Sequence, residues 1–152
     1  MEVLGCLDEF NSLLGLIRCR QTNQKFKDIL KNIQENLFII QAGVGKVAFN
    51  HKLKVPVFNK AETGKTEKLI DLFEKLLAPG KGFVISGENE ISAWLDYARA
   101  VARKTERSVL KLKKLNPDIF AYLNRLSGLL YVMARVAAKK KNTKESQPAY
   151  SL

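Results

Sequence analysis

The feature that most constrains this fold is the spacing of apolar residues, which recurs every three or four positions along most of the chain. That period places apolar side chains on one face of an α-helix. A short extended passage at residues 54–58 has no convincing strand partner, and there is no internal repeat. We therefore expect an all-α, five-helix bundle over residues 1–140, followed by a disordered polar tail at 141–152. The helices are expected near residues 2–19, 23–42 and 66–77, after residue 86, and from residue 117.

Local end signals support these helices. Gly43 and Gly45 are expected to end the second helix, and Pro117 fits the first position of the fifth. The expected N-caps are Asn23, Ser86 and Asn116.

Charge and cysteine content limit the setting of the protein. The net charge of +11 predicts an acidic partner, which could be nucleic acid, a membrane surface or a small phosphorylated ligand. Cys6 and Cys19 lie too far apart on one expected helix to pair, which predicts free thiols in a reducing compartment. No stretch is apolar enough to cross a bilayer and nothing resembles a cleavable signal, so we expect a cytoplasmic protein without a membrane partner.

The fourth helix carries a charged row. Arg99, Arg103 and Glu106 follow one another at i, i+4 and i+7 and share a face. Guanidinium groups suit phosphate oxygens, and a carboxylate between arginines can orient them or accept a hydrogen bond from a ribose. Spacing alone nevertheless favours a solvated face with ordinary ion pairs.

Polar residues interrupt two further helices. In the first helix Asp8 and Asn11 share a face, which alone would indicate a solvated patch. The fifth helix has a polar strip of Asn124, Ser127, Gly128, Tyr131 and Arg135. A glycine inside a helix costs roughly 1 kcal/mol relative to alanine. Gly128 therefore predicts either a close backbone approach or a lost side chain, with a tolerated surface glycine as an equal alternative.

Several familiar motifs are excluded. Gly64-Lys-Thr66 imitates the end of a phosphate-binding loop, but Asn59 replaces the first glycine of that motif and no strand precedes it. The single histidine, His51, has no Glu-x-x-His partner for a di-iron site, and there is no Cys/His cluster for zinc. The aromatic residues expected in the core, rather than as base-stacking platforms, are Phe26, Phe38, Phe73 and Tyr122.

Several segments, taken in order, carry a family resemblance. They are residues 7–15 (LDEFNSLLG), 33–38 (IQENLF), 83–87 (FVISG), 98–107 (ARAVARKTER), 115–117 (LNP) and 122–127 (YLNRLS). Together they resemble the PduO-type ATP:corrinoid adenosyltransferase family, over nearly the whole chain up to about Ala138. The resemblance implies a five-helix bundle that assembles as a homotrimer with its active site between subunits. It also implies a transferase that moves the 5′-deoxyadenosyl group of ATP to the cobalt of a reduced corrinoid, cob(I)alamin formed from cob(II)alamin, and releases triphosphate.

The resemblance assigns roles to individual positions. Phe83 would lie against the lower face of the corrin and help to displace the axial base. Asp8 and Arg99 would form an ion pair on the corrin side of the site. The residues that would surround the nucleotide, with Mg²⁺ on its phosphates, are Arg103, Glu106, Asn124 and Arg125. The protein itself would supply no metal ligand.

Four departures from the family pattern bear on activity. The family has a further N-terminal segment, with a Thr-Gly-Asp-rich loop that cradles the triphosphate, and we expect this chain to lack that ATP-binding loop. Gly128 stands where the family has Asp, and Lys104 where it has a second Arg. Ser86-Gly-Glu88 replaces the usual Pro-Gly-Gly. A non-catalytic corrinoid-binding or regulatory relative therefore remains an alternative, and a basic nucleic-acid-binding module, based on charge alone, is a third.

Overall fold

The computed structural model describes residues 2–50, 52, 54–78, 83–139 and 145–150, and all regular structure within them is helical. The helices are α1 (Glu2–Arg20), α2 (Gln24–Phe49), α3 (Ala61–Glu74), α4 (Glu90–Val109) and α5 (Pro117–Ala138). The predicted all-α, five-helix fold is confirmed.

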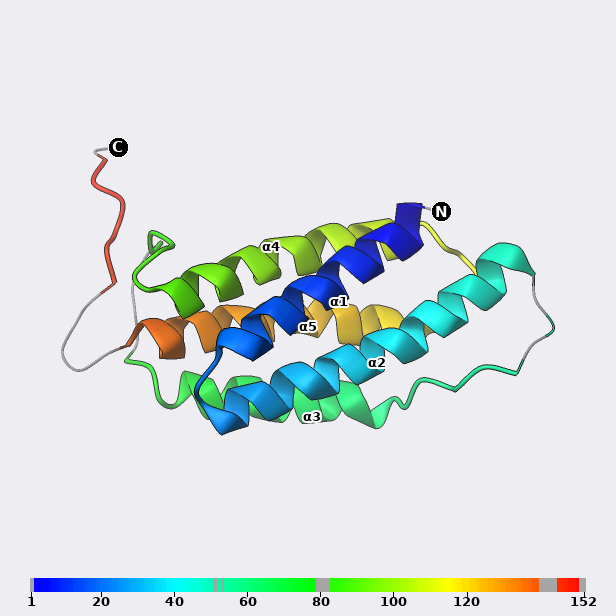
Figure 1. Cartoon of the computed structure of the whole chain (residues 1–152), viewed down its shortest axis with the longest axis horizontal. Coiled ribbons are helices and arrows are strands. Elements are labelled where there is room, and N and C mark those ends of the chain that lie inside the picture. The colour runs from blue at the N-terminus through cyan, green and yellow to red at the C-terminus, as the bar shows by residue number, and fades with distance from the viewer. Residues whose placement is uncertain (1, 51, 53, 79–82, 140–144, 151–152) are drawn as a thin grey trace.

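The helices lie side by side along one long axis (Figure 1). Each helix runs opposite to the one before it, so α5 has the direction of α3 (Figure 1). Helix α5 packs against both α3 and α4. Helix α1 in turn packs against α2 and α4. Helix α4 therefore lies between α1 and α5, where its two flanks can bring side chains from both neighbours together.

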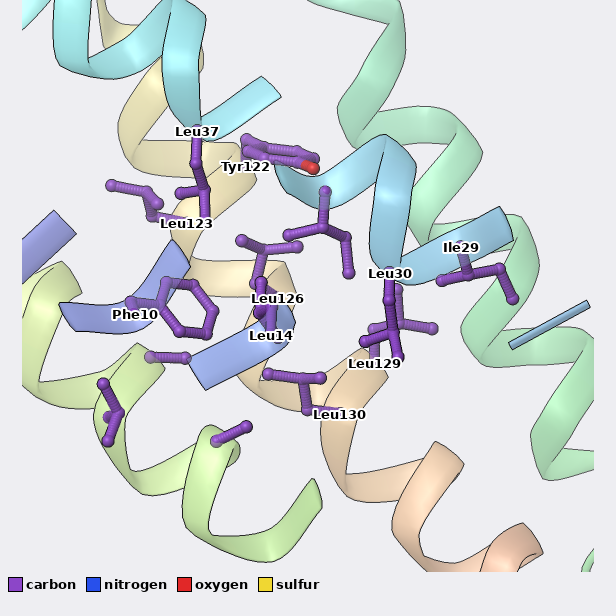
Figure 2. Packing of buried hydrophobic residues seen from close by; sticks show 14 of the residues in the cluster. Phe10, Leu14, Ile29, Leu30, Leu37, Tyr122, Leu123, Leu126, Leu129 and Leu130 are labelled. Carbon is purple, nitrogen blue, oxygen red and sulfur yellow. The ribbon is translucent and has the colours of Figure 1, made fainter. Parts of the chain in front are cut away.

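The core is formed by leucines and aromatic rings from facing helices (Figure 2). Phe10 and Leu14 of α1, Leu37 of α2 and Leu126 of α5 all have no exposed surface. Truncating one such leucine to alanine typically costs 2–5 kcal/mol, so this shared core fixes how α1, α2 and α5 sit against one another.

The prediction that Gly43 and Gly45 end the second helix is wrong, because α2 continues to Phe49. Val44, between the two glycines, is 1% exposed and belongs to the core. Its packing outweighs a propensity cost of roughly 1 kcal/mol per glycine. The helix instead ends at Asn50, whose φ of 50° is left-handed and whose backbone N–H donates to the Lys46 carbonyl.

The fourth helix also begins later than predicted. Its N-cap is Asn89 rather than Ser86: the Asn89 side chain accepts from the Ser92 backbone N–H, and the Ser92 hydroxyl accepts from that of Asn89. This is a reciprocal capping box. Asn116 caps α5 as predicted, accepting from the Asp118 backbone N–H. Helix α3 begins at Ala61, earlier than predicted.

The prediction that Phe38 lies in the core is wrong. Phe38 is 65% exposed, whereas the other three aromatic residues expected in the core are buried. Ile33, Leu37 and Ile40 occupy the buried face of α2 and leave Phe38 on the opposite side.

The last features to compare with the sequence are membrane-spanning potential, the two cysteines and the C-terminal tail. No helix in the described part of the chain is long and apolar enough to span a membrane. Cys6 and Cys19 are both free thiols. Within the tail, 141–144 and 151–152 lie outside the described residues, and disorder there stays a prediction. Glu145 and Ser146 contact the rest of the chain.

Candidate functional site

A buried carboxylate joins α4 to α5. Glu106, 6% exposed, has one oxygen 2.7 Å from Nη1 of Arg103, and its other oxygen accepts a hydrogen bond of 2.7 Å from the Asn124 amide. We call these three residues the Glu106 cluster. Nearly half of the Arg103 side chain is exposed (46%), so its guanidinium reaches solvent while Glu106 holds it in place. The arrangement presents a fixed cation and a fixed amide at the protein surface.

The sequence builds this cluster from two simple features. Arg103 and Glu106 are three residues apart on α4, so their side chains lie on one face. Asn124 comes from α5, which packs along α4 over much of its length. Part of the charged row predicted on the fourth helix is thus not a purely solvated face, because one of its members is buried and anchored by another helix.

Arg125, the next residue along α5, takes a different direction. Its Nε lies 3.7 Å from a carboxylate oxygen of Glu67 on α3, and it is not bonded to the Glu106 cluster. This pair is about half exposed, with side chains 41% and 55% accessible, and is worth at most about 1 kcal/mol in water. An anion arriving at this side could therefore draw Arg125 away from Glu67.

The remaining charged candidates are not brought together in the single chain. No ion pair joins Asp8 to Arg99 in the described structure, where Asp8 is exposed and Arg99 is half-buried. Lys104, at the position of the family's second arginine, lies 2.7 Å from Glu9 of α1. Its hydrogen bond to Glu9 raises the pKa of Lys104. Lys104 therefore links α1 to α4 rather than extending the Glu106 cluster.

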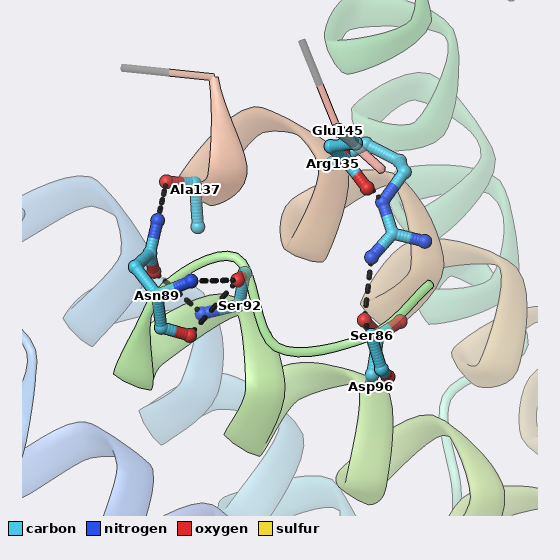
Figure 3. Close-up of polar contacts among 7 residues, drawn as sticks. All are labelled: Ser86, Asn89, Ser92, Asp96, Arg135, Ala137 and Glu145. Atoms are coloured by element: carbon cyan, nitrogen blue, oxygen red, sulfur yellow. Dashed lines mark hydrogen bonds and ion pairs between the residues drawn. The ribbon is translucent and has the colours of Figure 1, made fainter. Parts of the chain in front are cut away.

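Phe83 opens the segment that leads into α4, residues 83–89, which we call the Phe83 loop. The Phe83 side chain is 76% exposed. The loop is attached to α4 through Ser86, whose hydroxyl donates to Asp96 over 3.2 Å (Figure 3). Asp96 lies before Glu106 on α4, at a separation of about 15 Å along the axis at 1.5 Å per residue. The loop and the Glu106 cluster thus occupy different stretches of the same helix.

Sequence reasoning missed the partner of Asp96. Nη2 of Arg135, on α5, lies 2.5 Å from Asp96, and both side chains are more than nine-tenths buried. The sequence places Arg135 in the polar strip of the fifth helix but gives it no partner. The signal that could have joined Asp96 to Arg135 is that both lie on consecutive helices, which run antiparallel and pack against each other.

The structure also bears on the phosphate-loop motif, on Gly128 and on metal binding. Gly64 and Thr66 lie inside α3, where the Thr66 hydroxyl donates to the Glu62 carbonyl, so no phosphate-binding loop exists there. A Cβ on Gly128 would meet Ile70 at 3.5 Å, an ordinary contact, so no close backbone approach requires that glycine. The described residues contain no group of three or more ligating side chains that could hold a metal ion. His51 lies outside the described residues.

Comparisons with known proteins identify the family of the chain. The family model for cobalamin adenosyltransferase matches residues 1–137. The corrinoid adenosyltransferase PduO of Citrobacter freundii is 30% identical over 138 residues, covering 89% of this chain and 41% of that protein. The chain therefore spans about two fifths of the length of this relative. The corrinoid adenosyltransferase of Mycobacterium leprae is 32% identical over 141 residues, covering 86% of this chain and 73% of that protein.

Solved structures show the same fold. A variant PduO-type ATP:corrinoid adenosyltransferase from Lactobacillus reuteri, complexed with cobalamin and ATP, superposes with a TM-score of 0.88 at 23% identity. The match covers 97% of this chain and 84% of that one. Because the family model extends across the whole bundle and the mycobacterial relative matches over most of its own length, the chain belongs to the cobalamin adenosyltransferase family.

Proposed function

We propose that this protein transfers the 5′-deoxyadenosyl group of ATP to the cobalt of a reduced corrinoid. The observation that carries the proposal is the Glu106 cluster. The family resemblance assigns nucleotide contacts to all three side chains, and two of them, Arg103 of α4 and Asn124 of α5, converge on the buried carboxylate of the third, Glu106. A surface salt bridge would not need a buried acceptor with a second helix to hold it.

The chemistry explains why no acid–base pair accompanies the cluster. Cobalt(I) is itself the nucleophile: a cobalt–carbon bond forms at C5′ of ATP, the C5′–oxygen bond breaks, and triphosphate leaves with the bonding electrons. The protein has to hold the two substrates in line and stabilise the charge that develops on the leaving group. Neither task requires a proton to be transferred to or from a side chain.

On the nucleotide side, Arg103 and Arg125 would contact the phosphates, whose Mg²⁺ is carried by the nucleotide. The side chains of Arg103 and Arg125 are 46% and 41% accessible to solvent, so both can reach a ligand at the surface. Glu106 would orient Arg103, and the Asn124 amide would be fixed to receive the adenosine. Planar guanidinium groups suit phosphate oxygens better than lysine does.

On the corrin side, Phe83 would lie against the lower face of the ring. Its 76% exposed side chain, on a loop attached to α4, supports this role because burying it on a ligand recovers hydrophobic free energy. The alternative use of Phe83 as an internal packing residue is not supported by such exposure.

The assembly would be a homotrimer with Asp8 of one subunit facing Arg99 of the next, in a reducing cytoplasmic setting. The exposed Asp8 and the half-buried Arg99 are accessible to a neighbouring copy, which is compatible with this pairing. Sedimentation should give three times the 17.1 kDa chain mass. Exchanging the charges, Asp8→Arg with Arg99→Asp, should restore an assembly that either single change weakens; two silent single changes would contradict the pairing.

The transfer is tested by incubating the protein with MgATP and chemically reduced cobalamin and recording the absorption spectrum of the cobalt–carbon product. The proposal predicts product in proportion to time and enzyme. No product at stoichiometric enzyme would contradict it.

The alternative is a non-catalytic corrinoid-binding relative, favoured by Gly128 at a position where the family carries Asp. Calorimetric titrations separate the two functions. Corrinoid binding without ATP binding would identify the non-catalytic relative, whereas tight binding of both substrates supports the transferase.

A further inference from the structure

The C-terminal segment 145–150, which we call the strap, lies against the Phe83 loop. The backbone N–H of Ile85 donates to the carbonyl of Ser146 over 2.7 Å, two residues from Phe83. One residue earlier, the Glu145 carboxylate lies 2.8 Å from Nε of Arg135 and is 13% exposed. The strap therefore contacts the loop through its backbone. It contacts α5 through a largely buried ion pair between Glu145 and Arg135 (Figure 3).

Arg135 contacts both the carboxylate that holds the loop and the carboxylate of the strap. Its Nη2 lies 2.5 Å from Asp96, which accepts the hydrogen bond from Ser86 of the loop, and its Nε faces Glu145 of the strap. The guanidinium also lies 4.9 Å from the centre of the Tyr131 ring. One buried cation thus links α4, the loop, α5 and the strap.

The charges around Arg135 favour this linkage. Burial lowers the pKa of Arg135, but hydrogen bonding and attraction from Asp96, with a smaller contribution from Glu145, more than offset it and leave the pKa raised. Without Arg135, the carboxylates of Asp96 and Glu145 would face each other with like charge at a buried site. Removing the arginine should therefore loosen the strap and the loop together, whereas removing the strap should take away only the Ile85 restraint on the loop.

We propose that the strap is a positioning element that holds the Phe83 loop, with Arg135 as its positioning residue, so that Phe83 is presented to a corrin ring in one orientation. The role towards the corrin rests on the proposed function. The restraint of the loop by the strap does not depend on the proposed function. An exposed aromatic ring on an unrestrained loop would lose conformational entropy each time it bound, and the strap reduces that loss beforehand.

The first experiment compares two truncated chains. One ends after Lys144 and lacks the strap; the control ends after Gln147 and keeps both Glu145 and Ser146. Hydrogen exchange at the Ile85 amide should accelerate about tenfold or more in the shorter chain and stay unchanged in the control. Equal exchange in the two chains would overturn the proposal.

The second experiment measures cob(II)alamin and ATP affinity in the same two chains. The shorter chain should bind cob(II)alamin about tenfold more weakly with unchanged ATP affinity, because one restraint on the corrin side is lost. It should also show a smaller spectral change from loss of the axial base. Faster exchange with unchanged corrinoid affinity would overturn the role towards the corrin. If the full chain binds no corrinoid at all, the proposed function fails, while the exchange result still decides whether the strap restrains the loop.

Substitutions at Arg135 give a check that is independent of chain length. Arg135→Gln should reproduce the fast Ile85 exchange, and Arg135→Lys, which keeps the charge with fewer fixed donors, should restore part of the protection. Equal protection in the glutamine variant and the unmodified chain would overturn the role of Arg135. If Arg135→Gln does not fold, the truncated pair still decides the matter.

Discussion

At the scale of single residues, the candidate site is defined by which charges are buried and which are not. Glu106 is buried and has two partners. Among the described residues, Asp8 and Arg99 do not pair with each other, and Arg125 pairs with the half-exposed carboxylate of Glu67. Helical spacing predicted that Arg103 and Glu106 share a face, because that depends on the sequence alone. It could not predict that Asp96 pairs with Arg135, because that depends on how α4 and α5 are aligned.

Replacing Glu106 by glutamine should weaken ATP binding while leaving the fold intact. The change removes the negative charge that holds Arg103 and leaves one acceptor oxygen where Arg103 and Asn124 use two. We expect a loss of about 10- to 100-fold in ATP affinity by calorimetry, since charge-assisted hydrogen bonds contribute about 1.5–3 kcal/mol. Arg107→Gln, the exposed next residue on α4, is the control and should bind ATP normally. An unchanged affinity in Glu106→Gln would remove the cluster from the nucleotide site.

Replacing Phe83 by alanine should affect corrinoid handling and not stability. Because the ring is 76% exposed, the thermal midpoint should stay within experimental error. Transfer to cobalamin should fall by at least about tenfold, since contact with an aromatic ring contributes on the order of 1–3 kcal/mol. Phe38→Ala, a change of the same type at a 65% exposed site on α2, is the control. Equal activity in the two variants would exclude Phe83 from the corrin side.

The pH dependence of folding should reflect Glu62 of α3. Burial raises its pKa, but hydrogen bonds from Lys65 and Asn36 more than offset this, so the pKa lies below the ordinary value of 4.5. A lowered pKa means that ionised Glu62 stabilises the fold above pH 4.5, and that this stabilisation is lost as the pH falls through the folded-state value.

Glu62→Gln should therefore destabilise the protein by about 1–2 kcal/mol at pH 7, and by less at pH 3, in urea unfolding. Glu35→Gln on α2, which breaks only an exposed pair with Lys31, is the control and should cost less than about 0.5 kcal/mol. A destabilisation by Glu62→Gln that is the same at both pH values would contradict the assignment.

At the scale of elements, the sequence predicted the number and order of the helices but not all of their ends. Caps that use a side chain and a proline, as at Asn116, were correct because the signal is local. The end of α2 was wrong because Val44 is buried by residues distant in sequence, and that packing overrides two glycines. The start of α4 moved because Ser86 is used instead to attach the Phe83 loop to Asp96.

Gly128 offers a direct test of helix propensity against packing in α5. A Cβ there would make an ordinary contact with Ile70, so alanine should fit without displacing its neighbours. Gly128→Ala should raise the free energy of unfolding by about 0.5–1 kcal/mol, measured in urea. Gly45→Ala on α2, where a Cβ would meet nothing, provides the matched control and should give a similar gain. A loss of stability confined to Gly128→Ala would indicate a closer approach of α3 than the structure has.

At the scale of the whole molecule, the two halves of the proposed site lie apart on one chain. The Glu106 cluster lies toward the end of α4, and the Phe83 loop is attached near its start. Adenosyl transfer requires C5′ and cobalt to come within bonding reach. The proposed assembly of copies through Asp8 and Arg99 would determine how these halves are combined.

The most direct test of this account is a single-turnover experiment with the protein, MgATP and cob(I)alamin under strict exclusion of oxygen. The cobalt–carbon product is followed by its absorption, and triphosphate is quantified in the same sample. The account predicts one triphosphate for each cobalt–carbon bond, and a greatly slowed reaction in Glu106→Gln. Tight binding of cob(I)alamin with neither product formed at stoichiometric protein would contradict it.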